Sequence, residues 1–148
     1  MTNGGAGRRF DILLIDDSPS DARLVREALG GAFARSRLSV APNGLEAVAF
    51  LRRQGKYADA PRPDLILLDL NLPKKSGAEV LQEIKADQGL MRIPVVVLSS
   101  SAAREDVQAA YGLHANCFVT KPGDLDHFIQ AIRTIEAFWF TTAQLPSD

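Results

Sequence analysis

The fold follows from one short segment, Asp64-Leu65-Ile66-Leu67-Leu68-Asp69-Leu70-Asn71-Leu72-Pro73. Its four consecutive apolar residues are too few for a helix and are typical of a strand buried on both faces of a parallel sheet. Pro73 cannot donate to a sheet ladder, so the strand ends before it. Asp69 then lies at the carboxyl end of a central strand, where open α/β sheets bind their ligands. The alternative for Asp69 is an ordinary helix cap or turn residue.

The composition is that of a globular protein with one domain. The chain has 148 residues, of which 46% are hydrophobic, and a net charge of -1. This charge gives no broad electrostatic case for binding nucleic acid or an anionic membrane. Cys117 is the single cysteine of the sequence, so no disulfide forms within the chain, and a reducing compartment fits.

Targeting and membrane signals are not evident in the sequence. No apolar run approaches the roughly 20 residues that a membrane span needs. Residues 1–9 are rich in glycine and contain no apolar segment of a signal peptide. We therefore expect a cytoplasmic protein with a disordered segment at residues 1–9.

Strand and helix patterns alternate five times along the chain. The expected strands are residues 12–15, 38–41, 65–68, 93–98 and 116–120. Helix starts are indicated by Ser18-Pro19, by Asn43 with Glu46, by Ser76 with Glu79, and by Asp124. In the helix after Asn43, we expect Leu45, Val48, Ala49 and Leu51 to face inward. The alternation predicts the α/β class, with a doubly wound parallel sheet of five strands and helices on both faces.

Polar residues follow four of the five expected strands. The first strand ends on Asp16-Asp17, the third on Asp69, the fourth on Ser99 and the fifth on Lys121. In a doubly wound sheet these ends meet in one crevice. Clustered carboxylates repel one another, and hard oxygen ligands favour Mg²⁺ or Mn²⁺ over zinc. A carboxylate nucleophile between a divalent ion and a lysine can receive a phosphoryl group.

These motifs resemble the receiver domain of bacterial two-component response regulators, over roughly Phe10 to Phe138. The residues that match are Asp16-Asp17, Asp69 to Pro73 with Gly77, Ser99, Phe118 and Lys121-Pro122. The resemblance implies a flavodoxin-like fold with strand order 2-1-3-4-5. It places the receiver domain at residues 10–138 and a C-terminal extension at residues 139–148.

The resemblance also implies a phosphoacceptor and a metal site. Asp69 would take a phosphoryl group from a phosphohistidine of a sensor kinase. Asp17 and Asp69 would bind Mg²⁺ directly, and Asn71 would add its backbone carbonyl. Asp16 would act on the metal mostly through water.

Three further residues would act on the phosphoryl group by the same resemblance. Lys121 would hold the phosphoryl oxygens, Ser99 would hydrogen-bond to the phosphoryl group, and Phe118 would swing inward behind it as the switch aromatic. Phe118 stands where many receivers have Tyr, and Ser99 replaces the commoner Thr but keeps the hydroxyl. We also expect a cis peptide bond at Lys121-Pro122, which would aim the lysine back into the crevice.

A narrower resemblance points to a class of partner. Residues 71–75, 113–117 and 135–139 are similar to the small response regulators that partner bacterial phytochromes. The sensor kinase expected on this basis is a bacterial phytochrome. Ten residues after Phe138 cannot fold into an effector, so output would go through protein contacts. Oligomerisation, binding of a partner and relay of the phosphoryl group to another histidine all stay open.

Two other function classes share single features with this sequence. Haloacid-dehalogenase-like phosphatases also use a nucleophilic Asp with Mg²⁺ and Lys, but they typically carry a second Asp two residues later, where this chain has Asn71. Without that base the phosphoryl group should persist as a signal, so we expect no enzyme beyond slow self-phosphorylation and dephosphorylation. Nucleotide binding would need a glycine-rich turn after the first strand, where the chain has Asp16 to Pro19.

The C-terminal helix predicts a homodimer. At about 100° per residue, one arc of the helix collects the apolar residues Leu125, Phe128, Ile129, Ile132, Ile135 and Trp139, which should pack on the sheet. Glu136 falls awkwardly inside that arc. Phe138, Trp139 and Phe140 form a run that one helical face cannot cover, so we expect them to meet a second subunit. The alternative is that Trp139 and Phe140 fold back on their own domain.

Overall fold

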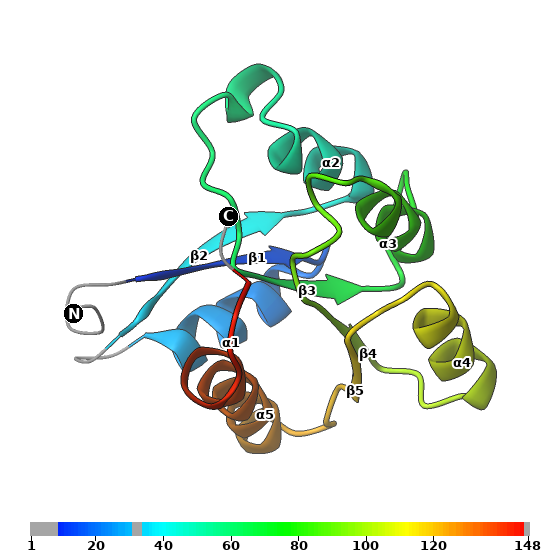
Figure 1. Cartoon of the computed structure of the whole chain (residues 1–148). Helices are drawn as coiled ribbons and strands as arrows, with labels where there is room; N and C mark the ends of the chain where they lie inside the picture. Colours follow the sequence, from blue (N-terminus) through cyan, green and yellow to red (C-terminus); the bar gives the residue numbers. More distant parts are fainter. Residues whose placement is uncertain (1–8, 31–33, 147–148) are drawn as a thin grey trace.

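The structure is a computed structural model that describes residues 9–30 and 34–146. One sheet of five parallel strands forms its centre, in the order β2-β1-β3-β4-β5 (Figure 1). The strands are β1 (Phe10–Ile15), β2 (Ser36–Ala41), β3 (Leu65–Asp69), β4 (Val95–Ser99) and β5 (Cys117–Thr120). The predicted fold class and strand order are confirmed. Apart from Arg9, the segment expected to be disordered lies outside the described residues.

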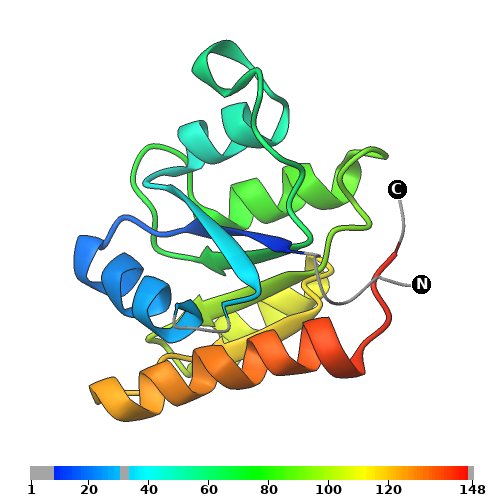
Figure 2. The ribbon, with the colours of Figure 1, turned by 90° about the vertical axis from the view of Figure 1, so that its left-hand side faces the viewer.

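Helices cover both faces of the sheet. They are α1 (Pro19–Leu29), α2 (Gly44–Leu51), α3 (Gly77–Ala86), α4 (Arg104–Gly112) and α5 (Leu125–Ala137), with the short turns η1 (Gly55–Tyr57) and η2 (Phe138–Thr142). Figures 1 and 2 show α1 and α5 side by side under one face, with α2 and α3 over the other. This is the layered arrangement that parallel strands require, since each crossover helix packs back on the sheet.

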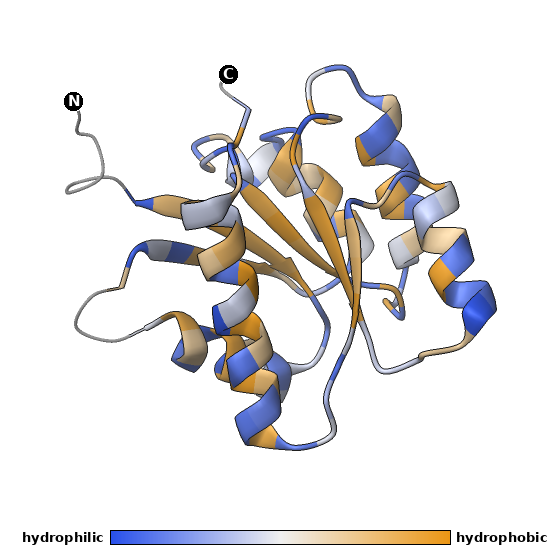
Figure 3. Cartoon of the chain, turned by 60° about the horizontal axis from the view of Figure 1, so that its bottom comes forward, coloured by the Kyte–Doolittle hydropathy of each residue, from blue (hydrophilic) through white to orange (hydrophobic). Residues whose placement is uncertain are grey.

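Two apolar cores hold these layers together. Every residue of β3 and β4 is buried, and the strands are the most hydrophobic part of the chain in Figure 3. Successive side chains point to opposite faces, so Ile66 and Leu68 join the α2–α3 core while Leu65 and Leu67 join the α1–α5 core. The central position of β3 fixes where its last residue, Asp69, emerges.

The inward face of α2 differs from the sequence expectation. Leu45 is 56% exposed, and the buried side chains of the helix are Ala47, Phe50 and Leu51. Asn43 caps the helix, with the Glu46 backbone N–H donating to its Oδ1 at 2.9 Å. The three buried side chains belong to the α2–α3 core, and this packing leaves Leu45 on the outer side of the helix.

The end of α5 accounts for two features of the sequence. Glu136 sits in the apolar arc because the Ser36 hydroxyl donates a hydrogen bond to its Oε2. Phe140 is buried and stacks on Phe10 of β1, with ring centroids 4.1 Å apart. The prediction that Phe140 meets a second subunit is therefore wrong, because its own β1 covers it. Leu125, expected in the buried arc, is the first residue of α5 and is 62% exposed.

No helix in the described part of the chain combines the length and the apolar character needed to cross a membrane.

Candidate functional site

Three carboxylates meet at the carboxyl edge of the sheet, as the sequence predicts. Asp16 and Asp17 follow β1, and Asp69 ends β3. One oxygen from each lies within 4.8 Å of the others. Backbone donors orient two of them, because the Ser18 N–H is 2.8 Å from Asp16 Oδ1 and the Asn71 N–H is 3.0 Å from Asp69 Oδ1. Asp16 and Asp69 are buried, whereas Asp17 is exposed.

Lys121 enters this cluster from the loop after β5. Its backbone N–H donates to the Ser99 carbonyl at 2.7 Å, which ties the ends of β4 and β5 together. Its Nζ lies 3.1 Å from Asp16 Oδ2 and 3.3 Å from Asp69 Oδ2. A third carboxylate, Asp21 Oδ2 of α1, lies closest, at 2.8 Å. The ammonium group therefore connects three elements at the crevice.

Asp21 is the site residue that sequence reasoning missed. It occupies the first turn of α1, where its backbone N–H donates to the Ser18 cap at 3.2 Å. An acidic residue in a first turn ordinarily needs no explanation beyond the helix dipole. The one available signal was its place four residues after Asp17, in the first turn of the helix that follows this strand end.

The expectation of a cis peptide bond at Lys121-Pro122 is wrong. No cis peptide bond occurs in the described residues, so this bond is trans. Trans is the favoured isomer even before proline, by about 0.5–1 kcal/mol. The Lys121 side chain reaches all three carboxylates with the trans bond in place, so the lysine needs no cis turn to enter the crevice.

Burial and charge shift two pKa values in the crevice. Burial raises the pKa of Asp16, and the Ser18 N–H and Lys121 offset only part of that rise. Burial lowers the pKa of Lys121, but the hydrogen bond that Lys121 donates to Asp21 and the charges of Asp16 and Asp69 outweigh it, so the pKa ends above its ordinary value. Lys121 is thus a permanent cation at neutral pH.

The donor set fits a hard divalent cation. Asp16, Asp17 and Asp69 offer carboxylate oxygens from one small cluster, which is the ligand type that Mg²⁺ and Mn²⁺ prefer. Asn71 lies two residues after Asp69 and is exposed. A single lysine against these carboxylates leaves an excess of negative charge for a cation to neutralise.

The two expected switch residues lie on neighbouring strands, Ser99 at the end of β4 and Phe118 on β5. Ser99 is almost fully buried, and its Oγ accepts a hydrogen bond from the Ser101 N–H at 3.1 Å. Phe118 packs partly buried against the α2–α3 core. Its backbone N–H donates to the Tyr111 hydroxyl of α4 at 3.2 Å, so the strand that carries Phe118 is joined to α4.

A close helix contact holds the Asp69 loop. Gly77 opens α3, and its N–H donates to the Leu70 carbonyl at 3.1 Å. A Cβ at this position would lie 2.4 Å from the Asp69 carbonyl oxygen. Only glycine lets the helix start so close to the backbone that carries Asp69. Ser76 and Glu79 form the predicted capping box, which fixes this helix end.

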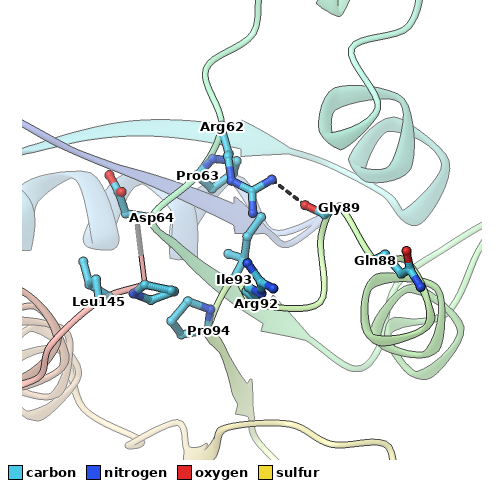
Figure 4. A pocket seen from close by; sticks show the side chains of 10 residues that line it. Arg62, Pro63, Asp64, Gln88, Gly89, Arg92, Ile93, Pro94 and Leu145 are labelled. Carbon is cyan, nitrogen blue, oxygen red and sulfur yellow. Dashed lines mark hydrogen bonds between the residues drawn. The ribbon is translucent and has the colours of Figure 1, made fainter. Parts of the chain in front are cut away.

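A separate cavity of about 340 Å³ opens at the amino ends of β3 and β4. Figure 4 shows Arg62 there, with its guanidinium group donating to the Gly89 carbonyl at 2.6 Å. Pro63, Pro94 and Leu145 supply apolar walls. The cavity lies at the opposite end of the strands from Asp69, so it takes no part in the carboxylate cluster.

Comparison with known proteins identifies the family. Residues 12–133 match the response regulator receiver domain. The chain belongs to this family. It is similar to the response regulator Rcp1 of Synechocystis sp., with 51% identity over 136 residues that make up 92% of each chain. The family resemblance predicted from the motifs is confirmed.

Solved structures agree with the fold and with the narrower resemblance. The crystal structure of the phosphorylated cyanobacterial phytochrome response regulator RcpA matches the receiver with a TM-score of 0.90 and 50% identity, over 94% of this chain and 99% of that chain. The Mn²⁺-bound form of Rcp1 matches with a TM-score of 0.88 and 50% identity, over 93% and 99%. The receiver is thus a phosphoryl acceptor of two-component signalling related to phytochrome response regulators, and the phosphatase alternative is not favoured.

Proposed function

We propose that Asp69 is the phosphoacceptor and that it takes its phosphoryl group from a phosphohistidine of a sensor kinase. The observation that carries the proposal is the position of Asp69. It ends the fully buried β3, lies within the three-carboxylate cluster, and faces the Lys121 ammonium group at 3.3 Å. Asp16 and Asp17 belong to a different strand end, and neither has this central place in the sheet.

The transfer is a displacement at phosphorus. A carboxylate oxygen of Asp69 forms the new P–O bond while the P–N bond to the histidine breaks, and the imidazole nitrogen leaves with the electron pair. Lys121 donates hydrogen bonds to the phosphoryl oxygens and stabilises the charge that gathers on them. Ser99 lies at the end of the neighbouring β4, where its hydroxyl can donate to the phosphoryl group once transfer is complete.

We further propose Mg²⁺ as the resident ion, with Mn²⁺ as a substitute. Asp17 and Asp69 would hold it directly, Asn71 through its backbone carbonyl, and Asp16 mostly through water. The ion supplies charge neutralisation for the carboxylates and the phosphoryl oxygens. The Mn²⁺-bound form of the similar Rcp1 supports a divalent ion at this kind of site.

The phosphorylated Asp69 should serve as a signal and not as an intermediate of catalytic turnover. Asn71 stands two residues after Asp69, where a phosphatase would place a carboxylate to activate water. We therefore propose that the receiver catalyses only its own phosphorylation and a slow dephosphorylation. A bacterial phytochrome with kinase activity is the proposed donor, because RcpA is itself a phytochrome response regulator. Since such a kinase makes phosphohistidine from ATP, we propose a cytoplasmic location.

The test is transfer to a defined residue. The protein is incubated with acetyl phosphate and Mg²⁺, or with an autophosphorylated phytochrome kinase, and the acyl phosphate is located by mass spectrometry. We expect label on Asp69 alone and none in Asp69→Asn, which keeps the shape of the side chain. The matched control is Asp64→Asn at the other end of β3, which should label normally. Label elsewhere, or normal uptake by Asp69→Asn, contradicts the assignment.

We also propose that the receiver forms a homodimer through the end of α5. Phe138 is 50% exposed, and it packs edge-on against the half-buried Trp139 with ring centroids 5.3 Å apart. Exposed aromatic side chains of this kind gather at the cores of protein interfaces. Phe140 is excluded from the contact because it stacks on Phe10 of its own chain.

A further inference from the structure

The carboxylate nearest to Lys121 lies outside the three-carboxylate cluster. Asp21 Oδ2 is 2.8 Å from Lys121 Nζ, against 3.1 Å for Asp16 and 3.3 Å for Asp69. The contact joins residues that are 100 positions apart in the sequence. It connects the first turn of α1 to the loop between β5 and α5. The side chains of Lys121 and Asp21 are 13% and 28% exposed, so the pair is partly shielded from water.

The placement of Asp21 is set by the start of α1. Ser18 caps the helix, its Oγ accepts from the Asp21 N–H, and Pro19 occupies the first turn. A cap and a proline make this turn one of the better-defined parts of a helix. The carboxylate therefore comes from a rigid element, whereas Lys121 sits on a loop before Gly123. A rigid acceptor can restrict a flexible lysine to one position.

The hydrogen bonds of the Lys121 ammonium group show how Asp21 can act on it. A lysine has three N–H donors, and Lys121 uses them on Asp16, Asp21 and Asp69. If Asp69 is phosphorylated, the third hydrogen must turn to a phosphoryl oxygen. Asp16 also belongs to the cluster suited to a cation, so its negative charge is shared. Asp21 is the one of the three that can keep its full charge on the lysine throughout.

We propose that Asp21 is a positioning residue, which holds the Lys121 ammonium group where it can bond to a phosphoryl group on Asp69. The inference rests on the proposed acceptance of phosphate by Asp69. In the unphosphorylated protein Asp21 keeps Lys121 in the crevice, and after transfer it remains as the anchor while the hydrogen bond to Asp69 is exchanged. Asp21 touches no reacting atom and acts through the lysine.

The experiment compares two aspartates that each lie in the first turn of a helix. Asp126 lies in the first turn of α5 and is exposed, so Asp126→Ala removes the same charge from the same part of a helix. With acetyl phosphate and Mg²⁺, we expect Asp21→Ala to take up label about tenfold more slowly than wild type. Asp126→Ala should match wild type within about twofold. Asp21→Asn keeps an oxygen acceptor for Lys121 and should fall between wild type and Asp21→Ala.

A second background separates positioning from a general effect on the fold or on charge. In a Lys121→Ala protein, adding Asp21→Ala should change the rate by less than about twofold, because the lysine through which it acts is gone. An equal slowing in both backgrounds overturns the inference, and so does faster uptake by Asp21→Ala, which would mean that Asp21 competes with the phosphoryl group. If wild type itself shows no label at Asp69, the proposed function fails, and this inference, which rests on it, fails with it.

Discussion

Replacing Gly77 with alanine should displace the backbone that carries Asp69. The added Cβ would lie 2.4 Å from the Asp69 carbonyl oxygen and 2.5 Å from the Leu70 Cα, while ordinary contact begins at 3.4 Å. Helix and loop must therefore separate by about 1 Å. Overpacking of this kind costs about 1–3 kcal/mol of unfolding free energy. A shift of about 1 Å at a reacting group slows its chemistry by roughly a hundredfold.

Two assays on Gly77→Ala check these magnitudes. Urea unfolding should show the loss of stability, and the rate of labelling by acetyl phosphate with Mg²⁺ should fall under conditions where the variant is still folded. The control is Gly112→Ala at the end of α4, where an added Cβ meets nothing within 4 Å. That variant should label normally and be no less stable, because alanine favours the helix. If Gly77→Ala matches Gly112→Ala in both assays, the close contact does not hold Asp69 in place.

Three further predictions concern charge and assembly. In metal-free buffer at pH 7, Asp16→Asn should raise stability to urea by on the order of 1 kcal/mol, because burial raises the pKa of Asp16 and its ionisation opposes folding. The gain should shrink as the pH falls toward 3.8, and a gain that is equal at both pH values would refute this cause. Asp17→Ala should weaken Mg²⁺ binding, measured by calorimetry, by at least about tenfold; unchanged binding would remove Asp17 from the ligand set. Phe138→Ser should sediment as a monomer that still accepts phosphate, and a wild type that is already monomeric at tens of micromolar would exclude the dimer.

Much of the fold could be read from the sequence because its strongest signals are local. The apolar runs at the centre of the chain are buried on both faces, so they need no partner to be recognised as strands of a parallel sheet. The caps at Ser18, Ser76 and Asp124 bond to the backbone three residues later, which is a contact within one turn. The exposure of Leu45 could not be predicted, because the buried face of α2 depends on how the helix lies on the sheet. Periodicity over eight residues does not fix that rotation.

The same distinction between local signals and packing between distant elements holds for the site. Asp16, Asp17, Asp69 and Lys121 were predictable because parallel strand ends share one edge, whatever the details of packing. The bond between Asp21 and Lys121 was not, since it depends on how α1 leans over the loop after β5. The bond between Ser36 and Glu136 and the stack of Phe10 on Phe140 are also contacts between distant elements. The first gives Glu136 a hydrogen-bond partner within the apolar arc, and the second places Phe140 in the α1–α5 core.

The charge balance at the crevice links stability to signalling. Three carboxylates, those of Asp16, Asp21 and Asp69, contact the ammonium group of Lys121. Asp17 adds a fourth negative charge beside Asp16 and Asp69. The buried part of this excess opposes folding, as the raised pKa of Asp16 shows. A divalent cation would relieve the repulsion among the three clustered acids, and it would do so most when the phosphoryl group brings further negative charge. Asp21 stays outside that cluster, so its charge continues to hold Lys121 where the phosphoryl group needs it.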